Sequence, residues 1–311
     1  MYNLNQWKNL FCQNVTPVNQ LENLKDIEIY IKRDDLNNSI VQGNKLRKLK
    51  YNFKYAIENN KDTIVTFGGA WSNHILAVAK SAALCNLKCI GFIRGDELQD
   101  QRNRWSSTLL KASEFGMNLV FLDRQEYRLK QHSNQVKKQL LDMTSQVHVI
   151  PEGGSNVLAL KGVSEVITEL IDQVQLPPTH IITACGTGGT AAGLILGVNQ
   201  LHWDSKVIGI PVLKGAHFLD DDISQFVSNK SLDNWSLYQD YHFGGYAKVT
   251  DQLKQFGTEF VSKNHIDLDK IYTVKSFFAA FDLIDKNIIP PKSRVLILHT
   301  GGLQGGSITS I

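Results

Sequence analysis

Short apolar runs alternate along the chain with longer segments whose apolar positions repeat at helical spacing. Runs rich in β-branched and aromatic residues predict strands at residues 27–31, 63–67, 88–92, 118–122, 147–150, 180–184, 207–212 and 294–299. The clearest helical patterns lie at residues 45–58, 72–84, 100–115, 125–141, 160–173 and 188–201. This alternation is typical of parallel sheets covered by helices, so we expect an α/β fold.

The length of the chain predicts two domains, because 311 residues exceed the usual size of a single core. The strand–helix unit recurs on both sides of the turn at residues 151–155. We place one domain crossing near that turn and another just after Lys45. The expected larger domain contains residues 1–47 and 155–311, and the smaller contains residues 48–154, with the active site in the cleft between them.

Composition and charge exclude several classes of protein. Hydrophobic residues make up 42% and charged residues 20%, as in ordinary globular proteins. The net charge is +3 without a run of like charge, so nucleic-acid binding is not expected. No 18-residue apolar stretch or secretory pattern is present, which favours a cytoplasmic protein without membrane contact. Four cysteines without a CxxC pair predict neither a metal site nor a disulfide framework.

The strongest local feature is the sequence CGTGGTAAG at residues 185–193, directly after a predicted strand and at the start of a predicted helix. Backbone amides that no Cβ obstructs form a phosphate cradle at such a junction, and the helix dipole assists. The alternative is a glycine turn made only for tight packing. We favour phosphate binding by Gly186, Thr187, Gly188, Gly189 and Thr190.

The same glycines resemble a dinucleotide fingerprint, which leaves the kind of phosphate open. That fingerprint requires an acidic residue at the end of the next strand, about 20 residues on. Here the next predicted strand, residues 207–212, is followed by Leu213 and Lys214. A phosphate monoester is therefore preferred to a nicotinamide cofactor.

Two further turns carry reactive side chains. In QGNKLRKL, residues 42–49, Lys45 begins a predicted helix, where the dipole lowers the proton affinity of its amine and helps imine chemistry. Most lysines are surface groups, so spacing alone makes this a weak candidate. In FGGAWSNH, residues 67–74, a hydroxyl, an amide and an imidazole lie at another predicted helix start. They suit a carboxylate or a ring hydroxyl, although Ser72 could simply be an N-cap.

These features, in this order, resemble the family of pyridoxal 5'-phosphate (PLP) enzymes that contains 1-aminocyclopropane-1-carboxylate deaminase and D-cysteine desulfhydrase. The resemblance spans nearly the whole chain. It rests on IKRDDL (31–36), GNKLRKL (43–49), GGxxSNH (68–74), PEGGSN (151–156), GTGGT (186–190), IYT (271–273) and HTGG (299–302). It implies the two-domain fold type II of the tryptophan synthase β-subunit, and a homodimer.

The resemblance also implies roles for individual residues. Lys45 would hold PLP as a Schiff base, Asn73 would bond the ring hydroxyl, and residues 186–190 would hold the phosphate. Ser72 and His74 would face the substrate, and Trp71 could narrow its pocket. Tyr272 would be an acid/base or ring-contacting residue, and Tyr246 matches a second active-site tyrosine.

The expected substrate is a small amino acid. The cyclopropane deaminase places a carboxylate at the position of Thr273, beside the ring nitrogen, and an apolar residue at the position of Thr300. Both hydroxyl residues resemble the desulfhydrase branch. We expect a PLP-dependent lyase or deaminase in which Lys45 takes the α proton, the β substituent leaves, and the product hydrolyses to pyruvate and ammonia.

Departures from the family pattern keep other activities open. Gln42 replaces the first glycine of GGNK, Trp71 replaces a glutamine, and Val274 replaces the glycine of the YxGK segment. The alternatives are cyclopropane deamination, another PLP elimination, racemisation, or binding of PLP or an amino acid without turnover.

Overall fold

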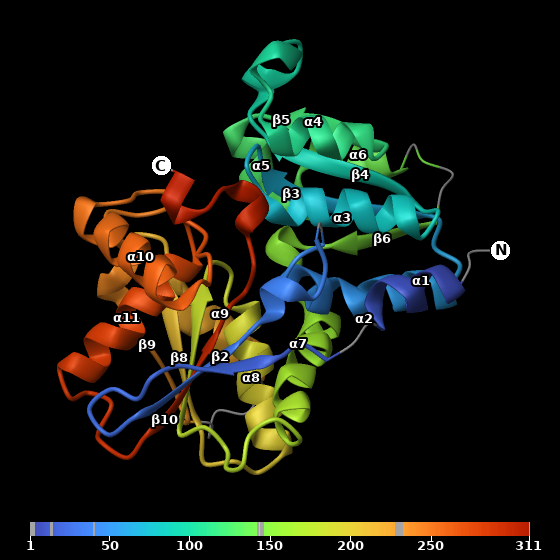
Figure 1. The fold of residues 1–311 in the computed structure, drawn as a ribbon. Coiled ribbons are helices and arrows are strands. Elements are labelled where there is room, and N and C mark those ends of the chain that lie inside the picture. The colour runs from blue at the N-terminus through green and yellow to red at the C-terminus, as the bar shows by residue number, and fades with distance from the viewer. Residues whose placement is uncertain are drawn as a thin grey trace. The chain divides into compact units, whose positions relative to one another are not determined.

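The computed structural model describes residues 4–12, 15–39, 41–141, 143, 146–227 and 233–310. The chain divides into two compact units, a smaller one of Met1–Gln13 with Lys45–Asn156 and a larger one of Asn14–Asn44 with Val157–Ile311. Figure 1 labels their elements. The prediction had placed the first residues in the larger domain. Helix α1 (Leu4–Phe11) belongs instead to the smaller unit, because Phe11 packs on Phe53 with ring centroids 5.5 Å apart.

The smaller unit is built on a four-stranded parallel sheet. Its strand order is β5 (Met117–Leu122), β4 (Lys88–Arg94), β3 (Thr63–Gly69) and β6 (Val147–Ile150). Its helices are α1, α2 (Asn44–Glu58), α3 (Asn73–Leu84), α4 (Ser107–Glu114), α5 (Arg124–Leu129) and α6 (Asn134–Leu141). Phe67 and Phe92 stack from neighbouring strands with centroids 5.4 Å apart, and they share a core cluster with Tyr127 and Val136.

Two of the predicted helices are shorter than their hydrophobic patterns suggested. The segment at 125–141 breaks between α5 and α6, because Lys130 adopts φ 50° and Ser133 accepts the backbone N–H of Val136 as a new cap. The segment at 100–115 begins with an isolated 3₁₀ turn at Arg102–Arg104. The continuous helices predicted over these two ranges were therefore wrong.

The larger unit contains a six-stranded sheet in which only β1 runs antiparallel. Its order is β1 (Val18–Gln20), β2 (Glu28–Lys32), β10 (Arg294–Leu298), β7 (His180–Cys185), β8 (Lys206–Pro211) and β9 (Trp235–Leu237). Its helices are α7 (Val157–Leu170), α8 (Gly189–Gln200), α9 (Phe218–Val227), α10 (Asp251–Asn264) and α11 (Thr273–Asp285). Both sheets confirm the predicted α/β class.

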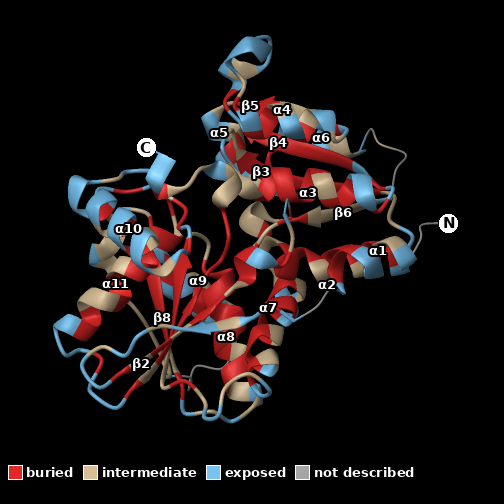
Figure 2. Cartoon of the chain, viewed as in Figure 1, coloured by how far each residue is buried: buried red, intermediate tan, exposed pale blue. Residues whose placement is uncertain are grey.

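Side chains of the larger sheet alternate between two apolar cores, as the two-residue period of a strand requires. Ile297 faces a core formed with α10 and α11, whereas Leu296 and Leu298 face a core formed with α7, α8 and α9. Figure 2 shows these strands as buried. Burial on both faces explains why the strands are nearly continuous apolar runs.

Helices α7 and α8 pack closely because two glycines of α8, Gly193 and Gly197, face α7. A Cβ on Gly193 would lie 2.5 Å from the Cβ of Val163, and one on Gly197 would lie 2.7 Å from Ile167. The segment between β8 and α10 contains α9 and β9, and residues 228–232 lie outside the described part of the chain.

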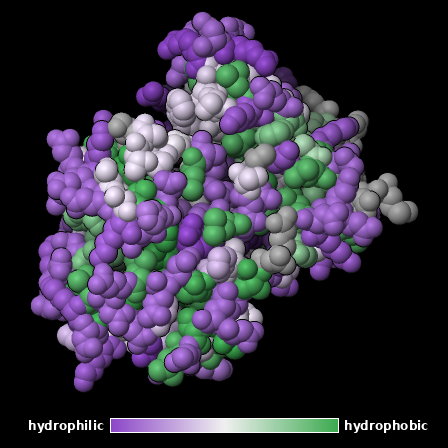
Figure 3. All heavy atoms as spheres, viewed as in Figure 1, coloured by the Kyte–Doolittle hydropathy of each residue, from purple (hydrophilic) through white to green (hydrophobic). Residues whose placement is uncertain are grey.

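The outer face drawn in Figure 3 is mostly hydrophilic, with apolar atoms scattered among polar ones. In the part of the chain that the structure describes, no helix has the length and apolar content needed to cross a bilayer.

Candidate functional site

Lys45 is the second residue of α2, so its predicted place at a helix start is confirmed. Its side-chain amine lies 3.4 Å from the carbonyl oxygen of Gly153. Desolvation lowers the pKa of Lys45 to about 8, even though part of its side chain remains accessible. Burial is thus the cause of the lowered pKa, whereas the sequence argument had invoked the helix dipole. An amine with such a pKa is partly neutral near physiological pH.

The turn Glu152–Gly154 gathers two amines. Gly153 and Gly154 both adopt left-handed backbone angles, with φ of 67° and 72°. The Gly153 carbonyl also accepts a hydrogen bond from Lys48 at 3.2 Å, and Lys48 donates to the hydroxyl of Ser155 at 3.0 Å. Lys48 is only 2% exposed. The turn therefore orients the amines of Lys45 and Lys48, which suits an anionic ligand.

His74 lies beneath this turn with a defined tautomer. The Thr66 hydroxyl donates to the carbonyl of Ile150, so it accepts its 2.8 Å hydrogen bond from Nε2–H of His74. Nδ1 then carries the lone pair, and among the described residues it has no hydrogen-bond partner. Burial, and then the charges of Lys45 and Lys48, hold the pKa of His74 well below its usual value. His74 is a neutral acceptor.

The neighbouring residues differ in exposure. Ser72 is the N-cap of α3, as predicted, and its Oγ accepts the backbone N–H of Ile75 at 3.4 Å. Asn73 is the first residue of the helix and is partly buried. Trp71 is 63% exposed. Its expected contact with substrate stays a prediction.

The glycine turn of the larger unit joins β7 to α8, at the predicted strand-to-helix junction. Gly188 has φ +71°, and a Cβ there would lie 2.9 Å from Ile223. A Cβ on Gly186 would lie 3.2 Å from the ring of Tyr272. The first N–H groups of a helix have no intrahelical acceptor, so those of α8 can bind an anion. The Asn44 side chain donates to Thr190 Oγ1 at 2.9 Å, and Asn44 directly precedes Lys45.

Tyr272 and Tyr246 are brought together in the larger unit. Their ring centroids are 6.0 Å apart, and the rings meet edge to face at 74°. Tyr272 is half-buried and lies against Gly186, whereas Tyr246 is 40% exposed. The two tyrosines predicted from the sequence thus lie together, and Tyr272 lies beside the glycine turn.

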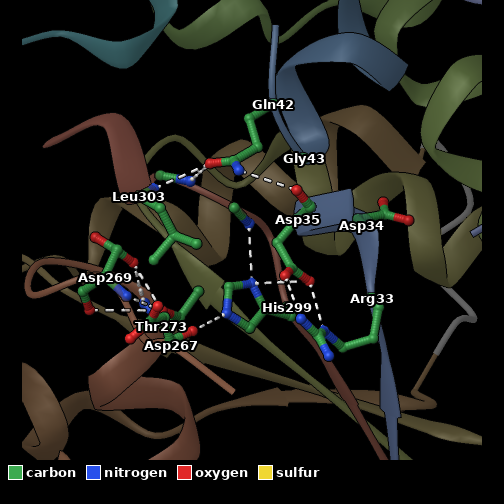
Figure 4. A network of polar contacts seen from close by, with 12 residues as sticks. Arg33, Asp34, Asp35, Gln42, Gly43, Asp267, Asp269, Thr273, His299 and Leu303 are labelled. Atoms are coloured by element: carbon green, nitrogen blue, oxygen red, sulfur yellow. Dashed lines mark hydrogen bonds and ion pairs between the residues drawn. The ribbon is translucent and has the colours of Figure 1, made fainter. Parts of the chain in front are cut away.

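Asp269, which the sequence analysis missed, holds the segment that carries Tyr272. Its carboxylate accepts the N–H groups of Ile271, Tyr272 and Thr273 at 2.6–3.2 Å, and Figure 4 shows the contact with Thr273. Thr273 is fully buried, and its hydroxyl donates to Asp269 Oδ1 at 2.9 Å. The signal in the sequence was an aspartate four residues before the threonine at a helix start. The hydroxyl proton of Thr273 is therefore already used in a hydrogen bond within the protein.

Lys275 was missed as well. Its fully buried amine donates to the carbonyls of His242 and Gly245, at 2.9 and 2.8 Å. Desolvation lowers the pKa of Lys275 to about 8, although Asp269 opposes the shift. These two hydrogen bonds hold the loop at residues 242–248, which contains Tyr246.

Thr300 lies beside the turn that precedes Lys45. It is 7% exposed, and its carbonyl accepts the N–H of Asn44 at 3.2 Å. A Cβ on Gly43, whose φ is +66°, would lie 1.8 Å from that carbonyl oxygen. Only glycine fits there.

Each unit carries a group that suits one end of a phosphate monoester bearing a reactive carbonyl. Amides at the start of α8 match a phosphate, and the partly neutral amine of Lys45 matches a carbonyl carbon. No acidic residue follows β8 for the ribose of a dinucleotide, since Pro211 is succeeded by Val212, Leu213 and Lys214. Across residues 4–310, outside the gaps in the description, no three His, Cys, Asp or Glu side chains gather as metal ligands.

Comparison with known proteins agrees with this chemistry. An Arabidopsis thaliana bifunctional D-cysteine desulfhydrase/1-aminocyclopropane-1-carboxylate deaminase, mitochondrial, is 31% identical over 296 residues, or 89% of this chain and 73% of its own. A D-cysteine desulfhydrase of Yersinia pestis is 28% identical over 310 residues, 93% and 92% of the two chains. The crystal structure of an ACC deaminase homologue matches with a TM-score of 0.81 at 28% identity, over 97% and 96%.

Residues 11–301 match the family described as pyridoxal-phosphate dependent enzyme. This match closes the dinucleotide alternative, and the expected fold type II is confirmed. The chain belongs to the family of pyridoxal-phosphate dependent enzymes, and pyridoxal phosphate is its cofactor.

Proposed function

We propose that this enzyme eliminates the β substituent of a small amino acid in the manner of D-cysteine desulfhydrase. D-cysteine and water would give pyruvate, hydrogen sulfide and ammonia. The observation that carries the proposal is Thr273: the residue after Tyr272 is a neutral hydroxyl already bonded to Asp269, and not a carboxylate whose negative charge could keep a ring nitrogen protonated. The activity is a lyase reaction, because water enters only after the β bond has broken.

Lys45 is the proposed attachment point and base. Pyridoxal phosphate, when bound, supplies an electron sink for the charge left at Cα. The lowered pKa of Lys45 keeps part of its amine neutral near pH 8, so it can attach to a carbonyl and later accept the α proton. Gly153 orients the amine through its carbonyl oxygen.

The other proposed roles rest on the family resemblance. The amides of Gly186, Thr187, Gly188, Gly189 and Thr190 would hold the phosphate. Asn73 would bond the ring hydroxyl, and Ser72 with His74 would contact the substrate. The unpartnered Nδ1 of His74 supports the last assignment, because a buried lone pair without a donor is costly.

The resemblance implied that Thr273 lies beside the ring nitrogen and that Thr300 is a second residue in contact with the cofactor. The hydroxyl proton of Thr273 is committed to Asp269, so we propose Thr300 as the ring contact and Thr273 as its buried support. Tyr272, packed on Gly186, would return a proton to the leaving group or the product, and Tyr246 would enclose the substrate.

The second candidate is cyclopropane deamination, which the name of the bifunctional plant relative favours. A panel of D-cysteine, L-cysteine, D-serine, 2,3-diaminopropionate and 1-aminocyclopropane-1-carboxylate separates the possibilities. Pyruvate, sulfide, 2-oxobutyrate and enantiomer exchange would be measured. We expect sulfide and pyruvate in equal amounts from D-cysteine, and loss of both in Lys45→Ala.

A different outcome would redirect the proposal. Turnover of the cyclopropane substrate alone would establish the deaminase. Exchange of enantiomers without pyruvate would establish a racemase. A full cofactor load without any product would leave a binding protein.

A substitution of Trp71 tests whether its side chain contacts the substrate. Because its side chain is 63% exposed, Trp71→Ala should leave the melting temperature unchanged. A rise in KM with kcat preserved would support a substrate contact, and unchanged kinetics would remove Trp71 from the site.

We also propose a homodimer in a reducing compartment such as the cytoplasm. None of the four cysteines, all of which lie in the described part of the chain, forms a disulfide, and three of them are buried, which supports the compartment. The homodimer rests on the resemblance. Analytical ultracentrifugation of the purified protein would measure its mass against the 34.9 kDa of one chain.

A further inference from the structure

Gln42 departs from the family pattern, which has glycine at this position, and its side chain makes three hydrogen bonds. Oε1 accepts the backbone N–H groups of Gly302 and Leu303, each at 3.0 Å. Nε2 donates to the carbonyl of Asp35 at 2.9 Å. Figure 4 shows the side chain reaching across to the Leu303 segment. One amide thus ties together three chain segments of the larger unit.

The turn that follows Gln42 is fixed on every side. The side chain of Asn37 accepts the N–H of Gly43 at 2.8 Å and donates to its carbonyl at 2.9 Å. The Thr300 carbonyl accepts the N–H of Asn44. The Cγ of Gln42 fills the space in which a Cβ on Gly301 would lie, 2.9 Å away. The turn at residues 42–44 and the segment at residues 300–301 therefore have little room to move independently.

Asp35, the third partner, is itself anchored. Arg33 donates to both of its carboxylate oxygens, at 2.9 and 2.7 Å. Nδ1 of His299 lies 3.4 Å from Asp35 Oδ1 and accepts the N–H of Gly301 at 3.2 Å. His299 Nε2 donates to the carbonyl of Asp267 at 2.6 Å (Figure 4). This network holds Thr300 from both neighbours, His299 and Gly301.

We propose that Gln42 is a positioning residue that sets the placement of Thr300 relative to the turn before Lys45. The inference rests on the proposed function, in which Thr300 contacts the cofactor ring and Lys45 attaches to it. Gln42 acts through Gly302, Leu303 and Asp35 and touches no reacting atom. A glycine at this position could make none of the three side-chain hydrogen bonds.

The three hydrogen bonds of the Gln42 side chain are called the clamp below. Gln42→Met tests the clamp, since methionine fills a similar volume without the polar atoms. We expect the variant to fold and to bind pyridoxal phosphate. Its kcat on the best substrate should fall about tenfold or more, while KM changes less, because misplaced catalytic groups reduce the rate of the chemical step. Hydrogen exchange of the peptide containing Gly302 and Leu303 should accelerate.

Gln42→Glu supplies a second, pH-dependent readout. An ionised glutamate still accepts from Gly302 and Leu303, but its other oxygen faces the carbonyl of Asp35, which cannot donate. A protonated glutamate can donate to that carbonyl. The activity of Gln42→Glu relative to wild type should therefore rise as the pH falls. Arg33, Asp35 and His299, which also face the network, are present in both proteins, so the ratio isolates the new carboxyl group.

Matched controls are Gln135→Met and Gln135→Glu at an exposed position of α6, which should behave as wild type. Unchanged hydrogen exchange in Gln42→Met, with kcat within twofold of wild type, would overturn the clamp. So would a flat activity ratio for Gln42→Glu. If wild type shows no visible band of lysine-bound cofactor and no turnover, the proposed function fails, whereas the exchange measurement still decides the clamp.

Discussion

The hydroxyl of Thr273 donates to the carboxylate of Asp269 across 2.9 Å, and the same carboxylate accepts the N–H groups of Ile271, Tyr272 and Thr273, where the chain enters α11. Replacing Asp269 with alanine would leave these buried donors without an acceptor. We expect a loss of about 3 kcal/mol in the free energy of unfolding, together with a fall in kcat because Tyr272 belongs to the same turn.

Thermal and urea denaturation would measure this loss, with Asp267→Asn as the control at an exposed aspartate. Asp269→Asn should fall between wild type and alanine, since it keeps one acceptor. Equal stability of Asp269→Ala and Asp267→Asn would contradict the capping role.

Lys45 should make the stability of the cofactor-free protein depend on pH. Its pKa falls from 10.5 to about 8 on folding, so the unfolded chain binds more protons between these values. Stability from this group is therefore lowest below pH 8 and rises as the pH increases toward 10.5. Lys45→Met lacks this contribution, so its stability advantage over wild type should shrink by on the order of 2 kcal/mol from pH 7.5 to pH 10.

Urea denaturation of both proteins across that range would measure the effect. Lys275, whose pKa is also lowered to about 8, is present in both and cancels. The exposed Lys111→Met serves as control. A stability difference that does not change with pH would contradict the desolvation of Lys45.

Alanine substitutions at Gly43 and Gly215 distinguish the cost of a steric clash from the cost of backbone strain. Both have positive φ, at 66° and 70°, but a Cβ on Gly215 would meet nothing within 4 Å. Gly215→Ala should therefore cost only about 1 kcal/mol of backbone strain. Gly43→Ala must displace the Thr300 carbonyl, so we expect a far larger loss of stability and loss of cofactor binding. Melting temperature and visible absorbance would report both, and similar behaviour of the two variants would refute the close contact.

Lys275 should control the loop that leads to Tyr246. Lys275→Met removes the donors to His242 and Gly245. Hydrogen exchange should accelerate in residues 242–248, and KM should rise if Tyr246 encloses the substrate. Lys248→Met, at an exposed position of the same loop, is the control. Unchanged exchange would show that the loop is held by other contacts.

The amino-acid sequence by itself determined the features that depend on neighbouring residues. The alternation of strands and helices, the N-cap at Ser72, the start of a helix at Lys45 and the glycine turn after β7 all lie where their local patterns placed them. Such features follow from side-chain period, capping and the backbone freedom of glycine, which act over a few residues.

Only the tertiary structure decided how distant residues use those features. Gln42 meets Leu303 across 261 positions, and Lys275 meets His242 across 33. The neutral state of His74 depends on the charges and burial around it, and not on its sequence neighbours. Hydrogen bonds and desolvation depend on distances that folding creates, so a local pattern names the candidate side chains while packing determines which groups each one contacts.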